Sequence, residues 1–167
     1  MTGLGALPIT AAAAFLLAVP LSAQGPDAQT LARDGLPRWA QGTVAAPAFA
    51  QRFSLDVDRN PYYLTGDFDA DGLQDIAIAI RQRATSKRGI ALVRRVGPHS
   101  MVIGAGTSFG NGGDDFRWLD LWRVEHRLDN PDLPSGRGDV LWVERYESAS
   151  ASIHWDGHAW RWTQFGD

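Results

Sequence analysis

The segment DIAIAIRQ at positions 75–82 leaves this chain few possible folds. Three isoleucines, at positions 76, 78 and 80, alternate with two alanines, so both faces of an extended segment would be apolar. A strand with one face in water would instead alternate apolar and polar residues. The segment therefore predicts a central strand that is buried on both faces, inside a β-rich domain.

The remaining apolar segments of residues 62–167 also predict strands. These segments are 62–65, 89–96, 100–105 and 139–147. The segment FRWLDLWRVEH, 116–126, fits either a strand or a helix. The last segment, 148–165, predicts a hairpin that turns at Asp156 and Gly157, with the serines and His154 on a face toward solvent.

Residues 24–61 have a different texture, with many turn residues and a helical pattern at 45–53. Pro47 suits the first turn of a helix, and Phe49 and Phe53 would share one of its faces. We therefore predict an α+β fold that is mainly β. A loop and helical segment at 24–61 would pack on a small antiparallel sheet formed by 62–167.

The segment DFDADGLQD directly precedes the predicted central strand and is rich in acid. Carboxylates lie at Asp67, Asp69 and Asp71 and again at Asp75, with Gly72 among them. Two carboxylates about 4 Å apart repel by about 1 kcal/mol in water and about 4 kcal/mol near a protein surface. Side chains at odd positions of a tight loop converge on one point, and the glycine permits the turn. The loop therefore predicts a site for a hard divalent cation, the alternative being an acidic surface turn without metal.

The spacing differs from that of an EF-hand loop. An EF-hand needs a bidentate Glu at position 12, where this chain has Ile78, and a helix after the loop rather than a strand. Leu73, at position 7, would present its backbone carbonyl to the ion. The last acidic ligand would come early, at Asp75.

The stretch LTGDFDADGLQDIAIAI resembles the calcium loop of FG-GAP/VCBS-type repeats, whose pattern is D-x-D-x-D-G-x-x-D before an apolar strand. The resemblance covers about residues 62–95. It implies Ca²⁺ bound by a set of five residues: Asp67, Asp69, Asp71, the carbonyl of Leu73, and Asp75. Such repeats usually recur as blades of a propeller, whereas this chain has one copy. The remainder is similar to short exported bacterial proteins that carry a single such loop.

The first 23 residues predict a signal peptide. An apolar run from Ile9 to Leu21 is followed by Ser22 and Ala23, which indicates cleavage after Ala23. A transmembrane anchor would need roughly 20 apolar residues, and this run is shorter and broken by Pro20. We expect a periplasmic or secreted protein with no transmembrane segment after cleavage. It has no cysteine, so packing or a bound ion must stabilise it instead of disulfides.

Charge narrows the possible partners. A net charge of −3 and a pI near 5.7 argue against nucleic acid, whose phosphates favour a basic face. We therefore expect a non-enzymatic calcium-binding module, structural or ligand-binding, of the cell envelope or exterior. Its partner would be an envelope protein or a glycan.

The segment 114–126 supports an alternative function. It holds four acids and a histidine beside two tryptophans: Asp114, Asp115, Asp120, Glu125, His126, Trp118 and Trp122. Two of these carboxylates would serve a small secreted hydrolase as acid and base. The tryptophans would alternatively form an aromatic platform for sugars, or fill the core. The sequence leaves these alternatives open.

Overall fold

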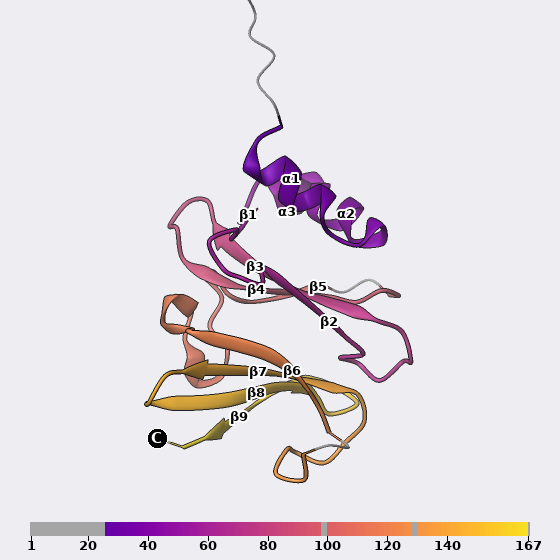
Figure 1. The fold of residues 1–167 in the computed structure, drawn as a ribbon, viewed down its shortest axis with the longest axis vertical. Helices are drawn as coiled ribbons and strands as arrows, with labels where there is room; N and C mark the ends of the chain where they lie inside the picture. Colours follow the sequence, from indigo (N-terminus) through magenta and orange to yellow (C-terminus); the bar gives the residue numbers. More distant parts are fainter. Residues whose placement is uncertain (1–25, 98–99, 128–129, 167) are drawn as a thin grey trace, which may run out of the picture.

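The computed structural model describes residues 26–97, 100–127 and 130–166, which form short helices followed by two antiparallel sheets (Figure 1). The predicted α+β, mainly β class is confirmed. The helices are α1 Ala28–Asp34, α2 Arg38–Ala45 and α3 Pro47–Ala50, with the 3₁₀ turns η1 Gly110–Gly112 and η2 Phe116–Trp118. The strands are β1 Phe53–Leu55, β2 Tyr63–Gly66, β3 Asp75–Gln82, β4 Arg88–Val93, β5 Ser100–Gly104, β6 Leu121–His126, β7 Asp139–Arg145, β8 Ala149–Trp155 and β9 Trp160–Phe165. The predicted signal peptide, 1–23, lies outside the described residues.

The first sheet contains β1 to β5, and β3 is its central strand. One edge of β3 pairs with β4, which pairs in turn with β5. The other edge is shared, because β2 pairs with residues 75–78 and β1 with residues 80–82. All of these pairings are antiparallel. The predicted central position of the DIAIAIRQ segment is confirmed.

The second sheet contains β6 to β9 in sequence order, each strand antiparallel to the next. The ambiguous segment 116–126 contains the turn η2 and then strand β6. The predicted C-terminal hairpin forms, but the prediction of a two-residue turn at its tip was wrong. Trp155 pairs with Trp160, so four residues join β8 to β9, and Asp156 Oδ1 accepts the N–H groups of His158 and Ala159.

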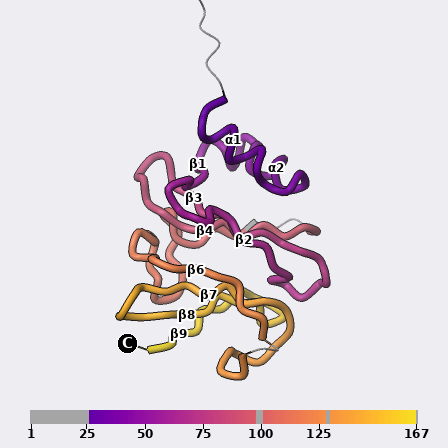
Figure 2. The backbone as a smooth tube through the Cα atoms, in the orientation of Figure 1, coloured from indigo at the N-terminus to yellow at the C-terminus, as the bar shows by residue number. Residues whose placement is uncertain are grey.

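The molecule is layered, as Figures 1 and 2 show. The three helices lie on one face of the first sheet, and the second sheet lies on its opposite face. The expectation of one small sheet was therefore incomplete. The second sheet buries the apolar residues on that opposite face, which are the alanines of β3 and the large residues of β4. Its own apolar residues pack against them.

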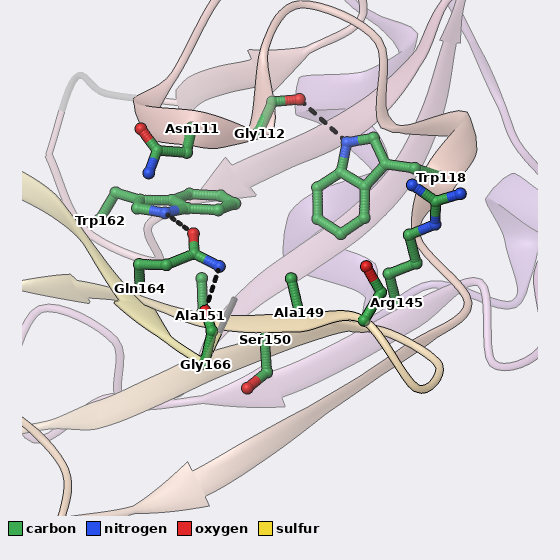
Figure 3. A pocket seen from close by; sticks show the side chains of 11 residues that line it. Asn111, Gly112, Trp118, Arg145, Ala149, Ser150, Ala151, Trp162, Gln164 and Gly166 are labelled. Atoms are coloured by element: carbon green, nitrogen blue, oxygen red, sulfur yellow. Dashed lines mark hydrogen bonds between the residues drawn. The ribbon is translucent and has the colours of Figure 1, made fainter.

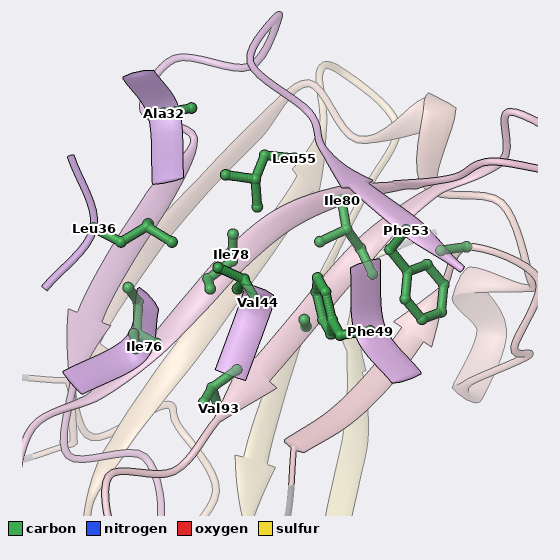
Figure 4. Packing of buried hydrophobic residues seen from close by; sticks show 13 residues of the cluster. Ala32, Leu36, Val44, Phe49, Phe53, Leu55, Ile76, Ile78, Ile80 and Val93 are labelled. Carbon is green, nitrogen blue, oxygen red and sulfur yellow. The ribbon is translucent and has the colours of Figure 1, made fainter. Parts of the chain in front are cut away.

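Two apolar clusters separate the three layers. The first lies between the helices and the first sheet (Figure 4) and includes Ala32, Leu36, Ala40, Val44, Phe49, Phe53, Leu55, Ile76, Ile78, Ile80, Ala91 and Val93. The second lies between the sheets and includes Phe68, Ala77, Ala79, Ile90, Leu92, Ile103, Phe116, Leu119, Trp122, Leu141, Val143, Ala151 and Ile153. Burial of this kind stabilises by about 25 cal/mol per Å² of apolar surface, so both interfaces contribute to folding.

Strands β3 and β4 divide their large and small side chains between the two faces. On β3 the isoleucines point to the helices and the alanines to the second sheet. On β4 the order is reversed, so Ile78 lies opposite Ala91 and Ala79 opposite Ile90. The pairs Ala77–Leu92, Ile78–Ala91 and Ala79–Ile90 therefore each combine a large and a small residue, which helps to fill both interfaces.

The helices are short, and among the three only α1 begins with a side-chain cap. Asp27 accepts the N–H of Thr30 at 2.7 Å and caps α1. Pro47 occupies the first turn of α3, as its position predicted. The rings of Phe49 and Phe53 meet with centroids 5.3 Å apart. In the described part of the chain, no helix is long and apolar enough to cross a lipid bilayer.

The outer face of the second sheet departs from the predicted wet face. Ser152 and His154 are both buried, at 0% and 5% exposure. The loop after β6 lies beside the end of β8, where Arg127 donates to the carbonyls of Trp155 and Pro134. Burial, and then the charge of Arg127, lowers the pKa of His154.

Candidate metal centre

The acidic loop connects β2 to β3, and its own side chains shape it. Asp69 Oδ1 accepts the N–H of Asp71 at 3.1 Å, and Asp71 Oδ1 accepts the N–H of Leu73 at 2.8 Å. Asp67 Oδ2 accepts the N–H of Gly72 at 3.0 Å, and Gly72 has a φ of +84°, which glycine adopts readily. These bonds curl the loop around its carboxylates.

Three of the predicted ligands converge. One carboxylate oxygen each from Asp67, Asp69 and Asp71 lies within 4.8 Å of the others. Oδ1 of Asp67 is buried and has no hydrogen-bond partner in the described residues. A buried oxygen without a partner costs free energy that a coordinated ion would recover. The carboxylates at this spacing therefore fit a hard divalent cation.

Asp75 and Leu73 stand apart from this group. The two oxygens of the Asp75 carboxylate accept the N–H groups of Phe68, at 3.2 Å, and Arg95, at 2.8 Å. Burial, reinforced by the charges of Asp69 and Asp71, raises the pKa of Asp75 to about 6. The leucine lies at the exposed rim of the loop. Ligation by these two residues stays a prediction.

A basic residue that was not predicted to be part of the site, Arg94, lies against the carboxylate cluster. Nε of Arg94, just beyond β4, is paired with Oδ2 of Asp69, whose side chain is fully buried. The guanidinium also lies over the ring of Trp155, 5.9 Å from its centroid. Arg94 therefore supplies part of the positive charge that the loop needs, and it links the loop to β8 of the second sheet.

The second sheet also bonds to the loop through the start of β7. Oδ2 of Asp139 accepts the N–H of Asp67 at 2.8 Å, and the Asp139 N–H donates to the Asp67 carbonyl at 2.7 Å. Gly138 precedes it with a φ of +81°, and a Cβ there would lie 2.7 Å from that carbonyl oxygen. The loop thus forms part of the joint between the two sheets.

A cavity of about 460 Å³ opens beside this joint. Asp67, Asp139, His126 and Arg127 are among the residues that line it. His126 Nδ1 lies 2.6 Å from Asp139 Oδ1. The cavity therefore reaches Asp67, one of the predicted ligands.

The acids of the alternative segment, 114–126, do not form a comparable group. Each has a local partner: Asp114 pairs with Lys87, Asp115 with Arg117, Glu125 with Arg123, and Asp120 accepts the N–H of Tyr146. Hydrogen bonds from the Arg88 and Arg117 N–H groups and the Arg117 charge together outweigh burial and lower the pKa of Asp115. A lowered pKa disfavours its use as a general acid.

The chain was compared with protein-family models, with curated proteins and with solved structures, and none of them matches. Function is therefore inferred from the residues themselves.

Proposed function

We propose that this protein is a non-enzymatic calcium-binding module of the FG-GAP/VCBS loop type, exported to the periplasm or exterior. The ion would be held by the carboxylates of Asp67, Asp69 and Asp71, with the Leu73 carbonyl and Asp75 completing the site. Two observations together carry the proposal: one oxygen from each of three carboxylates lies within 4.8 Å of the others, and a buried oxygen of Asp67 has no hydrogen-bond partner in the described residues.

Oxygen chemistry favours calcium over transition metals. The loop offers carboxylate and backbone oxygens, while the described residues of the group include no histidine or thiol. Carboxylate and carbonyl ligands suit Ca²⁺, Mg²⁺ and Mn²⁺, and a flexible loop with several carboxylates suits the larger ion. Extracellular calcium modules bind at about 10⁻⁴–10⁻³ M, which we expect here.

The role of the ion would be structural. The loop that would hold it bonds to Asp139 of β7 and, through Arg94, contacts Trp155 of β8. Neutralising the loop would therefore stabilise the contact between the two sheets as well as the β2–β3 connection. No substrate or chemical step is needed for this role.

Isothermal titration with Ca²⁺ and with Mg²⁺ tests the proposal. We expect calcium heat with a Kd of about 10⁻⁴–10⁻³ M and weaker magnesium binding. Asp71→Asn removes an exposed ligand with little effect on packing and should weaken binding at least about tenfold, since hydrogen bonds and contacts to charged groups are each worth about 1.5–3 kcal/mol. Asp132→Asn, which changes an exposed acid outside the loop, is the matched control. No heat with either ion would overturn the proposal.

Export has a separate test. The full chain, expressed in a bacterium, should be recovered from the periplasm or medium with Gln24 as its first residue by mass spectrometry. Recovery of the uncleaved chain from the cytoplasm would contradict export without affecting the calcium site.

A further inference from the structure

A second cavity lies where β7, β8 and β9 meet the turns η1 and η2 (Figure 3). It is at the opposite end of β7 and β8 from the residues that contact the acidic loop. Its volume is about 420 Å³, within the ~300–1,000 Å³ range of small-molecule sites. Its lining includes Asn111, Trp118, Arg145, Ala149, Trp162 and Gln164. None of the acidic-loop residues contributes to it.

Two tryptophans are held in fixed positions at this cavity. The indoles of Trp118 and Trp162 meet edge to face, with centroids 6.3 Å apart and planes at 76°. The indole N–H of Trp118 donates to the Gly112 carbonyl at 2.9 Å, and that of Trp162 to Oε1 of Gln164 at 3.0 Å. Phe116 supports both rings from the core, at 5.3 and 6.2 Å. The rings are therefore ordered without a ligand, which reduces the entropy lost on binding.

Two glycines of η1 allow this turn to pack directly against the side chain of Trp162. A Cβ at Gly110 or Gly112 would come within 2.3 or 2.8 Å of the Trp162 side chain, so the turn packs directly on this residue. Figure 3 shows Asn111 and Gly112 on one side of that indole and Gln164 and Ala151 on the other. Figure 3 also shows Ala149 and Ala151 on β8, below the two indoles, where both line the cavity. Small residues there leave room for a ring-shaped ligand.

The polar groups that line the cavity indicate which charge and shape of ligand it would bind. Arg145 is the charged residue among those that line it, and within the described ranges it forms no ion pair. The planar amides of Gln164 and Asn111 lie near Trp162 (Figure 3). An unpaired guanidinium beside aromatic faces favours a ligand that has an anionic group, polar edges and an apolar face.

From this arrangement we propose that the cavity lined by Trp118 and Trp162 binds a pyranose ring that carries a carboxylate. The C–H face of the sugar lies on an indole, its hydroxyl groups bond to the amides, and its carboxylate pairs with Arg145. The proposal is independent of calcium, because the acidic loop does not line this cavity.

Titration calorimetry with digalacturonate tests it, with the neutral galactose disaccharide of the same linkage as the comparison. We expect the acidic sugar to bind about tenfold more tightly than the neutral one, the worth of one charge-assisted hydrogen bond. Arg145→Gln should abolish that preference. Arg38→Gln, which removes an exposed positive charge on α2, is the matched control and should preserve it.

A second variant tests the position of the ligand. Ala149→Leu places bulk in the cavity below the indoles without removing any polar group, and circular dichroism with a melting curve verifies that it folds. We expect it to lose binding of both sugars. The proposal is overturned if wild type binds neither sugar, if it binds both equally, or if folded Ala149→Leu binds as wild type does.

Discussion

Replacing Asp67 by asparagine should change the stability of this protein in opposite directions with and without calcium. In wild type without metal, the Asp67 carboxylate lies among like charges and has one buried oxygen with no partner. The amide has nearly the same shape, keeps an oxygen to accept the Gly72 N–H, and carries no charge. Without calcium the variant should therefore be the more stable protein, and with calcium the less stable one.

The geometry sets the size of each effect. Two carboxylates 4.8 Å apart repel by about 3 kcal/mol at an effective dielectric constant of about 20. Arg94 offsets part of this repulsion at Asp69, and solvent screens the exposed Asp71, so we expect a gain of about 1–2 kcal/mol in chelator. In about 10 mM calcium, a Kd of about 10⁻⁴–10⁻³ M would stabilise wild type by about 1.4–2.7 kcal/mol.

Thermal and urea unfolding, each in chelator and in calcium at equal ionic strength, measure both effects. Wild type should melt about 4–10 °C higher in calcium, and Asp67→Asn should show little of that rise. Magnesium at the same concentration controls for non-specific charge screening. If wild type melted at one temperature under all conditions, or if the variant were less stable in chelator, the reasoning about repulsion and neutralisation would be refuted.

Three further predictions concern the stability of the fold and do not require the ion. Asp56 is 2% exposed and is ion-paired at 2.7 Å to Arg81, so Asp56→Asn should cost about 3 kcal/mol in urea unfolding, whereas Asp58→Asn, at 63% exposure, should cost under about 1 kcal/mol. Gly138→Ala should destabilise by at least about 1 kcal/mol, because its φ is positive and a Cβ would crowd the acidic-loop backbone. The pKa of His154 is lowered from 6.5, so the unfolded chain takes up a proton that the folded state resists, and the melting temperature should fall as the pH drops below about 6.5. His154→Gln should reduce this pH dependence, and a variant of the exposed His158 should not; equal slopes in both would contradict the assignment.

The sequence correctly predicted the features that depend only on residues close together in the chain. The alternation in 75–82 correctly predicted the central strand, because a two-residue period with both faces apolar has one low-energy arrangement in water. The spacing of Asp67, Asp69 and Asp71 likewise predicted that their oxygens converge, since a tight loop sets those distances over a few residues.

The second layer of the structure was beyond such reasoning. Strands β7, β8 and β9 were predicted one by one, and the segment of β6 was left open between a strand and a helix. Their separation into a second sheet depends on which faces meet, and residues far apart in the chain decide that. Asp139 reaches the acidic loop only through this layering, whereas Arg94, just beyond β4, reaches it through the pairing of β3 with β4. Nothing in the sequence around Asp139 indicated that this residue would bond to Asp67.

The opposed arrangement of side chains on β3 and β4 has a consequence for the accuracy of folding. If the two strands slipped by one residue, Ile78 would face Ile90 or Leu92, and alanine would face alanine or valine. One interface would then be overfilled while the other held voids, and each fault costs on the order of 1–3 kcal/mol. Side-chain volume therefore favours the native register of these two strands over registers shifted by one residue, and this preference does not depend on a polar group or a bound ion.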